Sequence, residues 1–266
     1  MKGRVLIVAG SDSGGGAGIQ ADIKTVTALG AYAATAITAL TAQDTLGVHG
    51  IVPVEPGFVR RQMSAVLRDI GADCIKTGML VDADIVEAVA DGLDADAPVV
   101  PLVVDPVMIA SSGARLLAEA GVLALKRRLI PRATVLTPNV PEAEALAGCA
   151  IASLADMRLA AARLLEMGAK SVVLTGGHLP GEVLYDLALD ARQSFVLEAR
   201  RIATNSTHGT GCTFASAIAA SLAQGLAFRP SVERAHAYVQ EAIRTAPGLG
   251  RGHGPLNHAH TIIRQG

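Results

Sequence analysis

The chain has 266 residues; half of them are hydrophobic, 3% are aromatic, and the formal net charge is −1 at pH 7. Such a charge gives no bulk attraction to nucleic acid or to an anionic membrane, so we expect neither as a partner. No uninterrupted apolar run is long enough to cross a bilayer. The length suits one large α/β domain spanning residues 1–266.

Cysteine usage points to a reducing compartment. The three cysteines, Cys74, Cys149 and Cys212, are too few and too scattered for a disulfide framework. We therefore expect a cytoplasmic protein.

In chain order, short apolar strands alternate with amphipathic helices. The pattern predicts strands over 4–10, 32–43, 74–80, 101–108, 133–139 and 171–178. It predicts helices over 19–30, 56–71, 82–93, 118–130, 142–148 and 153–168, and an extended piece over 48–55. This alternation is typical of a mainly parallel sheet covered by helices on both faces.

Of three later segments, the first departs from that rhythm. Residues 182–203 contain two extended runs around "DARQ", which predicts a small antiparallel hairpin at the sheet edge. "NSTHGTGCTFASAIAASLAQG", from Asn205, is a Gly-rich turn leading into an apolar helix. Residues 248–260 read as an ordered loop or short cap.

Polar clusters follow many of the predicted strands. They are "GSDSGGGAG", "TAQDT", "KTGML", "DPVM", "TPNVPEAE", "TGGH" and "THGTGC". Each is also explained by a Gly-rich turn, a helix cap or a strand-ending proline. Because ligands bind beyond the carboxyl ends of parallel strands, the recurrence of these polar clusters at the ends of consecutive strands predicts one contiguous cleft.

The glycine-rich loop after the first strand matches a relaxed dinucleotide pattern. Gly16 to Ala21 fit G-x-G-x-x-A, but the second strand lacks the acid that would hold a ribose; Asp44 follows only in the next loop. We therefore interpret these glycines as allowing close approach of the backbone to a small flat substrate.

Candidate cation ligands follow the later strands. Asp105, Asn139 and Glu142 offer the hard oxygen ligands that suit Mg²⁺, although Asp105 in a turn and Glu142 in a first helical turn are equally ordinary. Lys76 ends another strand and has the alternative of a surface lysine. His258 and His260 lack a third ligand at a recognised spacing, so we expect them to face solvent.

Cys212 stands where a helix is predicted to begin. A free cysteine is often a small buried apolar residue. At a helix N-terminus, however, the dipole and N–H groups lower a thiol pKa. The same N–H groups stabilise charge on a transferring phosphoryl group, and a base there takes the proton of an attacking hydroxyl.

These motifs together resemble one family. "THGTGCT" is similar to the anion-hole motif of ribokinase-like kinases, usually G-[AT]-G-D, with Cys212 in place of the acid. That replacement is typical of the hydroxymethylpyrimidine and phosphomethylpyrimidine kinases of thiamine biosynthesis. "AGSDSGGGAGIQADIKT", "TALTAQDT", "KTGML", "VVDPVM", "VLTGGH" and "GHGPLNHAH" also resemble family segments, with Asp44 in place of the usual Asn.

The resemblance implies a role for each matching residue. It implies in-line phosphoryl transfer from MgATP, with Cys212 as base, a ribokinase-like fold without a large lid domain, and a homodimer. The implied anion hole is Gly209, Thr210, Gly211 and Cys212; the pyrimidine site is Gln43, Ala17, Gly18, Met79 and Val107; the nucleotide is bordered by Thr175, Gly177 and Lys76; and Mg²⁺ is arranged by Asp105, Asn139 and Glu142.

Two alternatives stay open. A pyridoxal or pyridoxine kinase on the same fold would also bind a flat heteroaromatic ring carrying a hydroxymethyl group. The Gln43 amide favours an aminopyrimidine edge, because that edge both donates and accepts. A non-catalytic ligand sensor is the alternative from another class, since fold alone does not prove activity.

Overall fold

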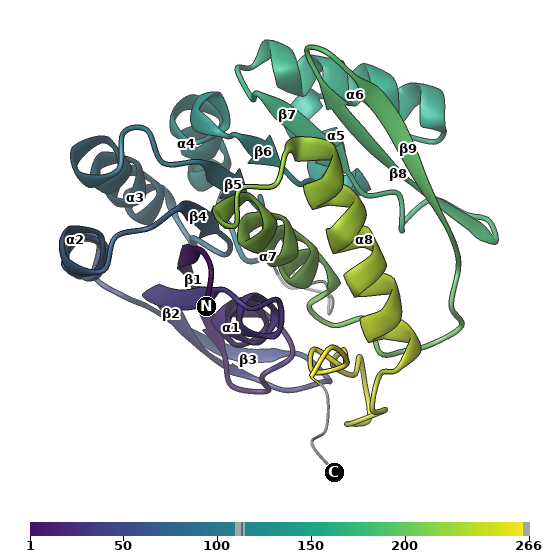
Figure 1. Ribbon diagram of the computed structural model, residues 1–266, viewed down its shortest axis with the longest axis horizontal. Helices are drawn as coiled ribbons and strands as arrows, with labels where there is room; N and C mark the ends of the chain where they lie inside the picture. The colour runs from purple at the N-terminus through teal and green to yellow at the C-terminus, as the bar shows by residue number, and fades with distance from the viewer. Residues whose placement is uncertain (110–112, 114, 263–266) are drawn as a thin grey trace.

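The computed structural model describes residues 1–109, 113 and 115–262. Within them a single sheet of nine strands runs in the order β3-β2-β1-β4-β5-β6-β7-β8-β9 (Figure 1). The strands are β1 (Arg4–Asp12), β2 (Tyr32–Gln43), β3 (Val48–Pro53), β4 (Cys74–Thr77), β5 (Leu102–Val104), β6 (Val135–Leu136), β7 (Ser171–Leu174), β8 (Val183–Asp190) and β9 (Ser194–Arg200).

Helices cover both faces of this sheet, as the sequence predicted (Figure 1). One layer holds α1 (Gly18–Ala28), α7 (Thr210–Ala223) and α8 (Phe228–Arg244). The other holds α2 (Pro56–Asp69), α3 (Ala83–Asp96), α4 (Glu119–Arg128), α5 (Val140–Ala147) and α6 (Leu154–Glu166), with a short 3-10 helix η1 (Ile130–Arg132).

Strand β1 shows how one run of residues serves both layers. Leu6 and Val8 pack into the core beneath α2 and α3, whereas Val5 and Ile7 pack against the layer of α1 and α7. Because successive side chains alternate across a strand, burial on both faces requires an apolar residue at every position. This explains the continuous apolar run that the sequence shows there.

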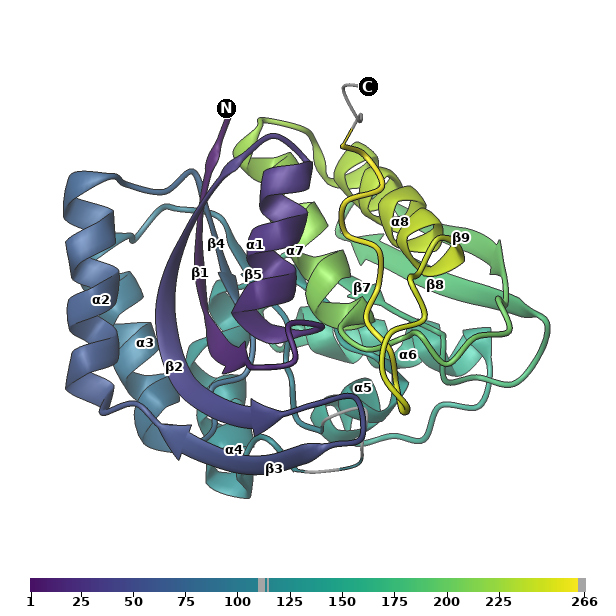
Figure 2. The same ribbon diagram turned by 90° about the horizontal axis from the view of Figure 1, so that it is seen from below.

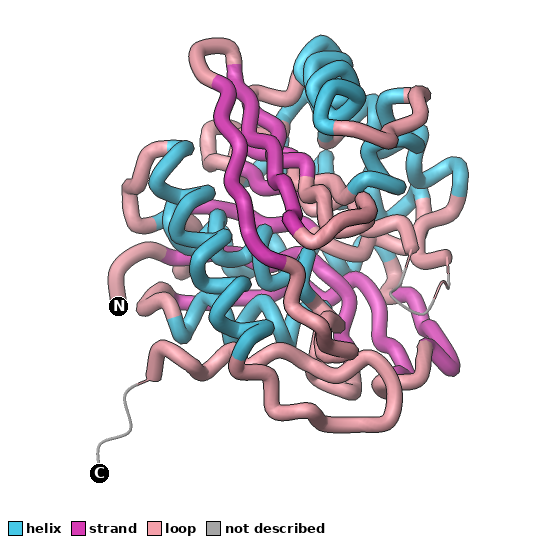
Figure 3. Tube along the Cα trace, turned by 90° about the vertical axis from the view of Figure 1, so that its right-hand side faces the viewer, coloured by secondary structure: helices cyan, strands magenta, loops and turns pink. Residues whose placement is uncertain are grey.

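Both edges of the sheet are antiparallel. The predicted hairpin is confirmed: β8 pairs antiparallel with β7 and with β9, which forms one edge (Figure 3). At the other edge β3 pairs antiparallel with β2, and the two strands form a long curved pair (Figure 2). The strands from β2 through β7 in the sheet order are parallel.

Helix α8 was not among the predicted elements, although its apolar face packs beside α7 (Figure 1). The 248–260 segment is a loop, as expected, but two of its histidines do not face solvent as predicted: His258 is buried and His260 is half-buried. His258 is buried and lies 3.0 Å from the hydroxyl of Thr213, and His260 bonds the carbonyl of Tyr238. Their expected exposure was wrong, because this loop lies across α7 and α8. None of the helices that the structure describes is both long and apolar enough to cross a membrane.

Candidate active site

The carboxyl ends of the parallel strands open into one cavity of about 1030 Å³. The chain passes from β1 outward to β2 and returns to β4 on the other side of β1, which creates the crevice where such sheets bind ligands. The predicted site residues that line it are Ala17, Gly18, Gln43, Met79, Asp105, Val107, Asn139, Glu142, Thr175, Gly177, Gly209, Thr210, Gly211 and Cys212. The predicted contiguous cleft is therefore present, and Lys76 is the one predicted residue outside its lining.

Two close backbone contacts set the shape of the cavity wall formed by the β1–α1 loop and the start of α7. Gly209, the residue before α7, has φ +81°, and a Cβ there would lie 1.9 Å from the carbonyl oxygen of Gly16. Gly18 has φ +55°, and its Cβ would lie 2.4 Å from the carbonyl oxygen of Gly10. Glycine is required at both positions, because a side chain clashes and the left-handed backbone disfavours it. These contacts place the β1–α1 loop directly against the start of α7.

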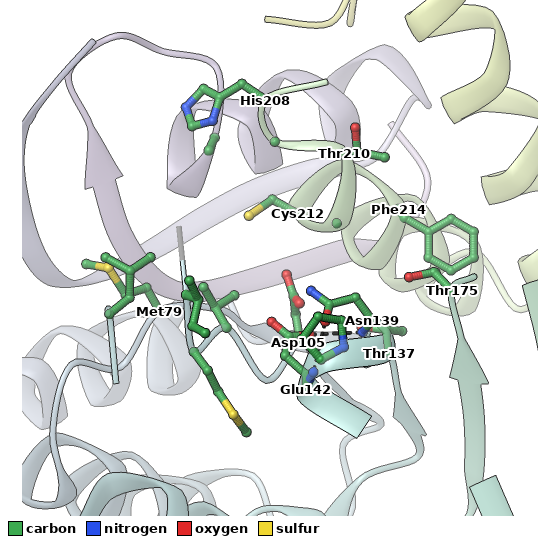
Figure 4. Close-up of a pocket in the computed structure, with 18 of the residues that line it drawn as sticks. Met79, Asp105, Thr137, Asn139, Glu142, Thr175, His208, Thr210, Cys212 and Phe214 are labelled. Atoms are coloured by element: carbon green, nitrogen blue, oxygen red, sulfur yellow. Dashed lines mark hydrogen bonds between the residues drawn. The ribbon is translucent and has the colours of Figure 1, made fainter. Parts of the chain in front are cut away.

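The first turn of α7 faces the cavity. Gly209 contributes no side chain, and no described side chain caps the helix. Helix N-terminal N–H groups without a cap are a ready anion site. Figure 4 shows Cys212 on this turn, above Asp105, and both residues line the cavity.

The electrostatics of Cys212 differ from the sequence expectation. We expected the helix N-terminus to lower the thiol pKa. Instead, removal from water raises the pKa of Cys212 to about 12, Asp105 and Asp22 add to the rise, and Lys76 opposes it. Desolvation first, and then the two nearby carboxylates, set this direction, which is opposite to the expected lowering and favours the protonated thiol at neutral pH.

Lys76 lies beneath the cavity rather than on the surface. Its side chain is fully buried, and its Nζ lies 3.0 Å from both carboxylate oxygens of Asp22 and 3.5 Å from Oδ2 of Asp105. Burial alone would lower the pKa of Lys76, but Asp22 raises it above its ordinary value. The alternative of a surface lysine was therefore wrong. A direct nucleotide contact by Lys76 has no support from this position, and Lys76 instead supplies buried positive charge under Cys212.

Asp105, Asn139 and Glu142 lie together on the opposite wall (Figure 4). Asn139 caps α5: its Oδ1 accepts from the Glu142 N–H at 2.9 Å, while Glu142 Oε2 accepts from the Asn139 N–H at 3.0 Å. The expected capping role of Glu142 is thus present. Burial first, and then the neighbouring Asp105, raise the pKa of Glu142 to about 8.

The free groups of this cluster suit a hard cation. Asp105 Oδ2 is buried and has no hydrogen-bond partner among the described residues, and the Lys76 ammonium lies 3.5 Å from it. Burial also raises the pKa of Asp105, so the two carboxyls compete for ionisation in the absence of a cation. The described residues contain no cluster of three or more His, Cys, Asp or Glu side chains suited to a metal. A cation here would therefore need ligands beyond the protein, as Mg²⁺ does when it is held by one or two carboxylates and phosphates.

Gln43 ends β2 and lines the cavity on the side of β1. Its amide lies 3.2 Å from His208, and His208 in turn lies 2.9 Å from Asp12; the sequence analysis singled out neither residue. Both stand inside motifs quoted above, "THGTGC" and "GSDSGGG", but neither motif indicates that they pair. Asp44, the departure from the family pattern, is outside the cavity: its carboxylate accepts from the N–H groups of Leu46 and Gly47 in an exposed turn.

The far end of the cavity lies between β7, β8 and α8. Thr175 and Gly177 border it, with His236 Nε2 3.8 Å from Asp186 Oδ2. Arg201 donates to the carbonyls of Gly177 and Gly181, which fixes the loop after β7. This end is separate from Gln43 and can accept a second ligand.

Known proteins share both sequence and fold with this chain. It is 52% identical over 97% of its length to the "Thiamine biosynthesis bifunctional protein ThiED" of Geobacter sulfurreducens, of which it spans about half (52%). It is 48% identical to the "Hydroxymethylpyrimidine/phosphomethylpyrimidine kinase" of Bacillus subtilis, with coverage of 96% of this chain and 94% of the relative.

Solved structures agree. An ADP complex of Bacillus subtilis pyridoxal kinase superposes with a TM-score of 0.90 at 36% identity, covering 97% of this chain and 98% of that one. A phosphomethylpyrimidine kinase from Clostridium difficile gives 0.81 at 39% identity, covering 91% and 100%. A family model described as "Phosphomethylpyrimidine kinase" matches residues 12–257. The predicted family and kinase class are confirmed: the chain belongs to the phosphomethylpyrimidine kinase family.

Proposed function

We propose that the protein transfers the γ-phosphoryl group of ATP to the hydroxymethyl group of 4-amino-5-hydroxymethyl-2-methylpyrimidine, and then phosphorylates the monophosphate to the diphosphate for thiamine biosynthesis. The observation that carries this proposal is the cavity itself. Its lining includes the uncapped start of α7 with Cys212, the Gln43 amide, which suits an aminopyrimidine, and residues beside β7 and on α8 that could border a second ligand.

The chemistry follows from these positions. The substrate hydroxyl attacks the γ-phosphorus in line, and the bond between that phosphorus and the β–γ bridging oxygen breaks. The N–H groups of α7 hold the phosphoryl oxygens, so catalysis rests on positioning and electrostatics. Asp105, Asn139 and Glu142 fit Mg²⁺, which when bound there would neutralise phosphate charge.

Cys212 is the proposed base for the hydroxyl proton. A thiolate with a raised pKa is a strong proton acceptor but a scarce species at neutral pH. The nearby ammonium of Lys76 lowers the pKa of Cys212 and therefore favours the thiolate. Cys212→Ala should lower turnover by roughly 10²–10⁴-fold, the usual size of a general-base effect. Nucleotide affinity, measured by calorimetry, should stay near the wild-type value. Near-normal turnover would return Cys212 to a packing role.

Pyridoxal is the second candidate substrate, favoured by the 0.90 TM-score to a pyridoxal kinase. The higher identity to pyrimidine kinases, 48% against 36%, favours the pyrimidine. Steady-state kcat/KM for the hydroxymethylpyrimidine, its monophosphate and pyridoxal separates the candidates. A larger value for pyridoxal would overturn the assignment, and no turnover of any of the three would favour a ligand sensor.

A cytoplasmic location and a homodimer belong to this proposal as well. Both are expectations from the family resemblance. Sedimentation equilibrium of the purified protein tests the dimer, and a monomer at micromolar concentration would contradict it.

A further inference from the structure

A chain of hydrogen bonds reaches Gln43 from the β1–α1 loop. Nε2 of His208 lies 2.9 Å from Oδ2 of Asp12 and 3.2 Å from the amide nitrogen of Gln43 as placed. On the other side of the amide, Gln43 Oε1 lies 3.2 Å from the hydroxyl of Thr41. That hydroxyl also donates to the carbonyl of Ser11 at 2.9 Å.

Asp12 is held as a charged acceptor. Its carboxylate accepts from the N–H groups of Gly14, Gly16 and Ala17 at 2.8–3.0 Å. Burial alone would raise the pKa of Asp12, but the hydrogen bonds from His208 and from these backbone groups hold it below its ordinary value. The same bonds occupy loop N–H groups that a dinucleotide pyrophosphate would need, which agrees with the rejection of that motif.

The charge of Asp12 fixes the hydrogen on His208. A carboxylate only accepts, so Nε2 of His208 carries a hydrogen and donates it to Asp12. A protonated Nε2 has no lone pair, so it cannot accept from the Gln43 NH₂ group. The oxygen and nitrogen of an amide are distinguished only by their partners. The one Nε2 hydrogen goes to Asp12, so the contact with Gln43 is favourable only when the Gln43 carbonyl shares that hydrogen as a second acceptor. The Gln43 NH₂ group then faces Thr41.

Thr41 agrees with that orientation. Its one hydrogen is given to Ser11, so its oxygen is free to accept from the Gln43 NH₂ group. The Gln43 NH₂ group then has the Thr41 oxygen as its acceptor, and the Gln43 carbonyl shares the His208 hydrogen with Asp12. One N–H and one oxygen lone pair of Gln43 remain for a ligand in the cavity, and the positions of this donor and this acceptor are fixed.

We infer that His208, held by Asp12, is a positioning residue for substrate specificity: it fixes which end of the Gln43 amide donates and which accepts toward the ring. This inference rests on the proposed function. An aminopyrimidine presents a ring nitrogen that accepts a hydrogen bond beside an amino group that donates one. If the Gln43 amide were reversed, its NH₂ group would face the amino group and its oxygen would face the ring nitrogen, so neither hydrogen bond could form. The structure supports a rigid arrangement, since the His208 side chain is buried and the backbone N–H of His208 donates to the Gly254 carbonyl.

The test combines His208→Leu with Gln43→Leu, and measures the affinity for 4-amino-5-hydroxymethyl-2-methylpyrimidine and for ATP by calorimetry. His208→Leu should weaken pyrimidine binding roughly 10-fold, the size of one net hydrogen bond, and leave ATP affinity within about 2-fold. His208→Gln can donate from a similar position and should recover most of the loss. His49→Leu removes an exposed histidine outside the cavity and should change neither affinity.

The double variant gives the decisive result. If His208 acts through Gln43, His208→Leu has no further effect on pyrimidine affinity once Gln43 is leucine. An equal loss in both backgrounds would overturn the inference. If His208→Leu lowers the melting temperature or the ATP affinity, Thr41→Val replaces it in a second double-mutant cycle with Gln43→Leu. The effects of these two substitutions on pyrimidine affinity should be non-additive in the same way. A wild-type protein that fails to bind the pyrimidine would refute the proposed function itself, whereas binding with additive losses refutes only the role of His208.

Discussion

Alkylation of Cys212 by iodoacetamide tests the electrostatics at the start of α7 without requiring a substrate. The thiol is partly exposed and lines the cavity, so a small reagent can reach it. Its pKa is about 12, against an ordinary value of 9.0. At pH 7 this difference lowers the thiolate fraction about 10³-fold relative to a thiol in an unfolded peptide.

The observed rate also depends on intrinsic nucleophilicity. A thiolate of higher pKa is more nucleophilic, with a Brønsted coefficient of about 0.4–0.5. A rise of about three pKa units therefore makes the thiolate roughly 15- to 30-fold more reactive, which offsets part of the loss in thiolate fraction. The net expectation is alkylation of Cys212 roughly 30- to 70-fold slower than that of a peptide thiol. Cys74, which is fully buried, is the internal control and should not react in the folded protein.

The pH dependence separates charge from steric blocking. We would quantify the Cys212 peptide by mass spectrometry from pH 7 to pH 10.5, with the fold checked by circular dichroism. The rate should rise about tenfold per unit across that whole range, because the thiol stays below its pKa. A plateau near pH 9 would show an ordinary thiol reached through a narrow opening. A plateau near pH 7 would show that the helix dipole prevails, and would refute the reasoning.

Two further predictions concern stability. The Glu142 pKa of about 8 lies above its ordinary 4.5, so the folded state keeps a proton that the unfolded state releases; the unfolding free energy should fall as pH rises from about 4.5 to about 8. Glu142→Gln should flatten that dependence and raise the Mg²⁺ concentration for half-maximal rate; identical pH curves and Mg²⁺ titrations would reduce Glu142 to its capping role. Gly209→Ala forces a Cβ onto the Gly16 carbonyl and should lower the melting temperature by several degrees, at about 2–4 °C per kcal/mol in a domain of this size. Gly211→Ala, whose Cβ enters open space, is the matched control, and an equal loss in both would contradict the clash.

The sheet and its helical layers were largely predictable because their signal is local. The apolar run of β1 and the alternating strands and helices are read directly from the order of residue types. The 182–203 hairpin was predicted for the same reason. Helix α8 was missed even though it has a strongly one-sided apolar face. The β3 segment was predicted only as an extended piece, because its pairing with β2 depends on the assembled sheet and not on its own residues.

The sequence by itself determined the family, the mainly parallel sheet, and the residue types at the strand ends and at the start of α7, including Asp105, Gln43 and Cys212. Only the tertiary structure decided how those residues affect one another, because burial and the approach of distant charges depend on three-dimensional neighbours. Lys76 became a buried cation through Asp22, 54 residues earlier, and the Cys212 pKa rose rather than fell. Asp12 and His208 are 196 residues apart, and only the contact between the β1–α1 loop and the start of α7 brings them to Gln43.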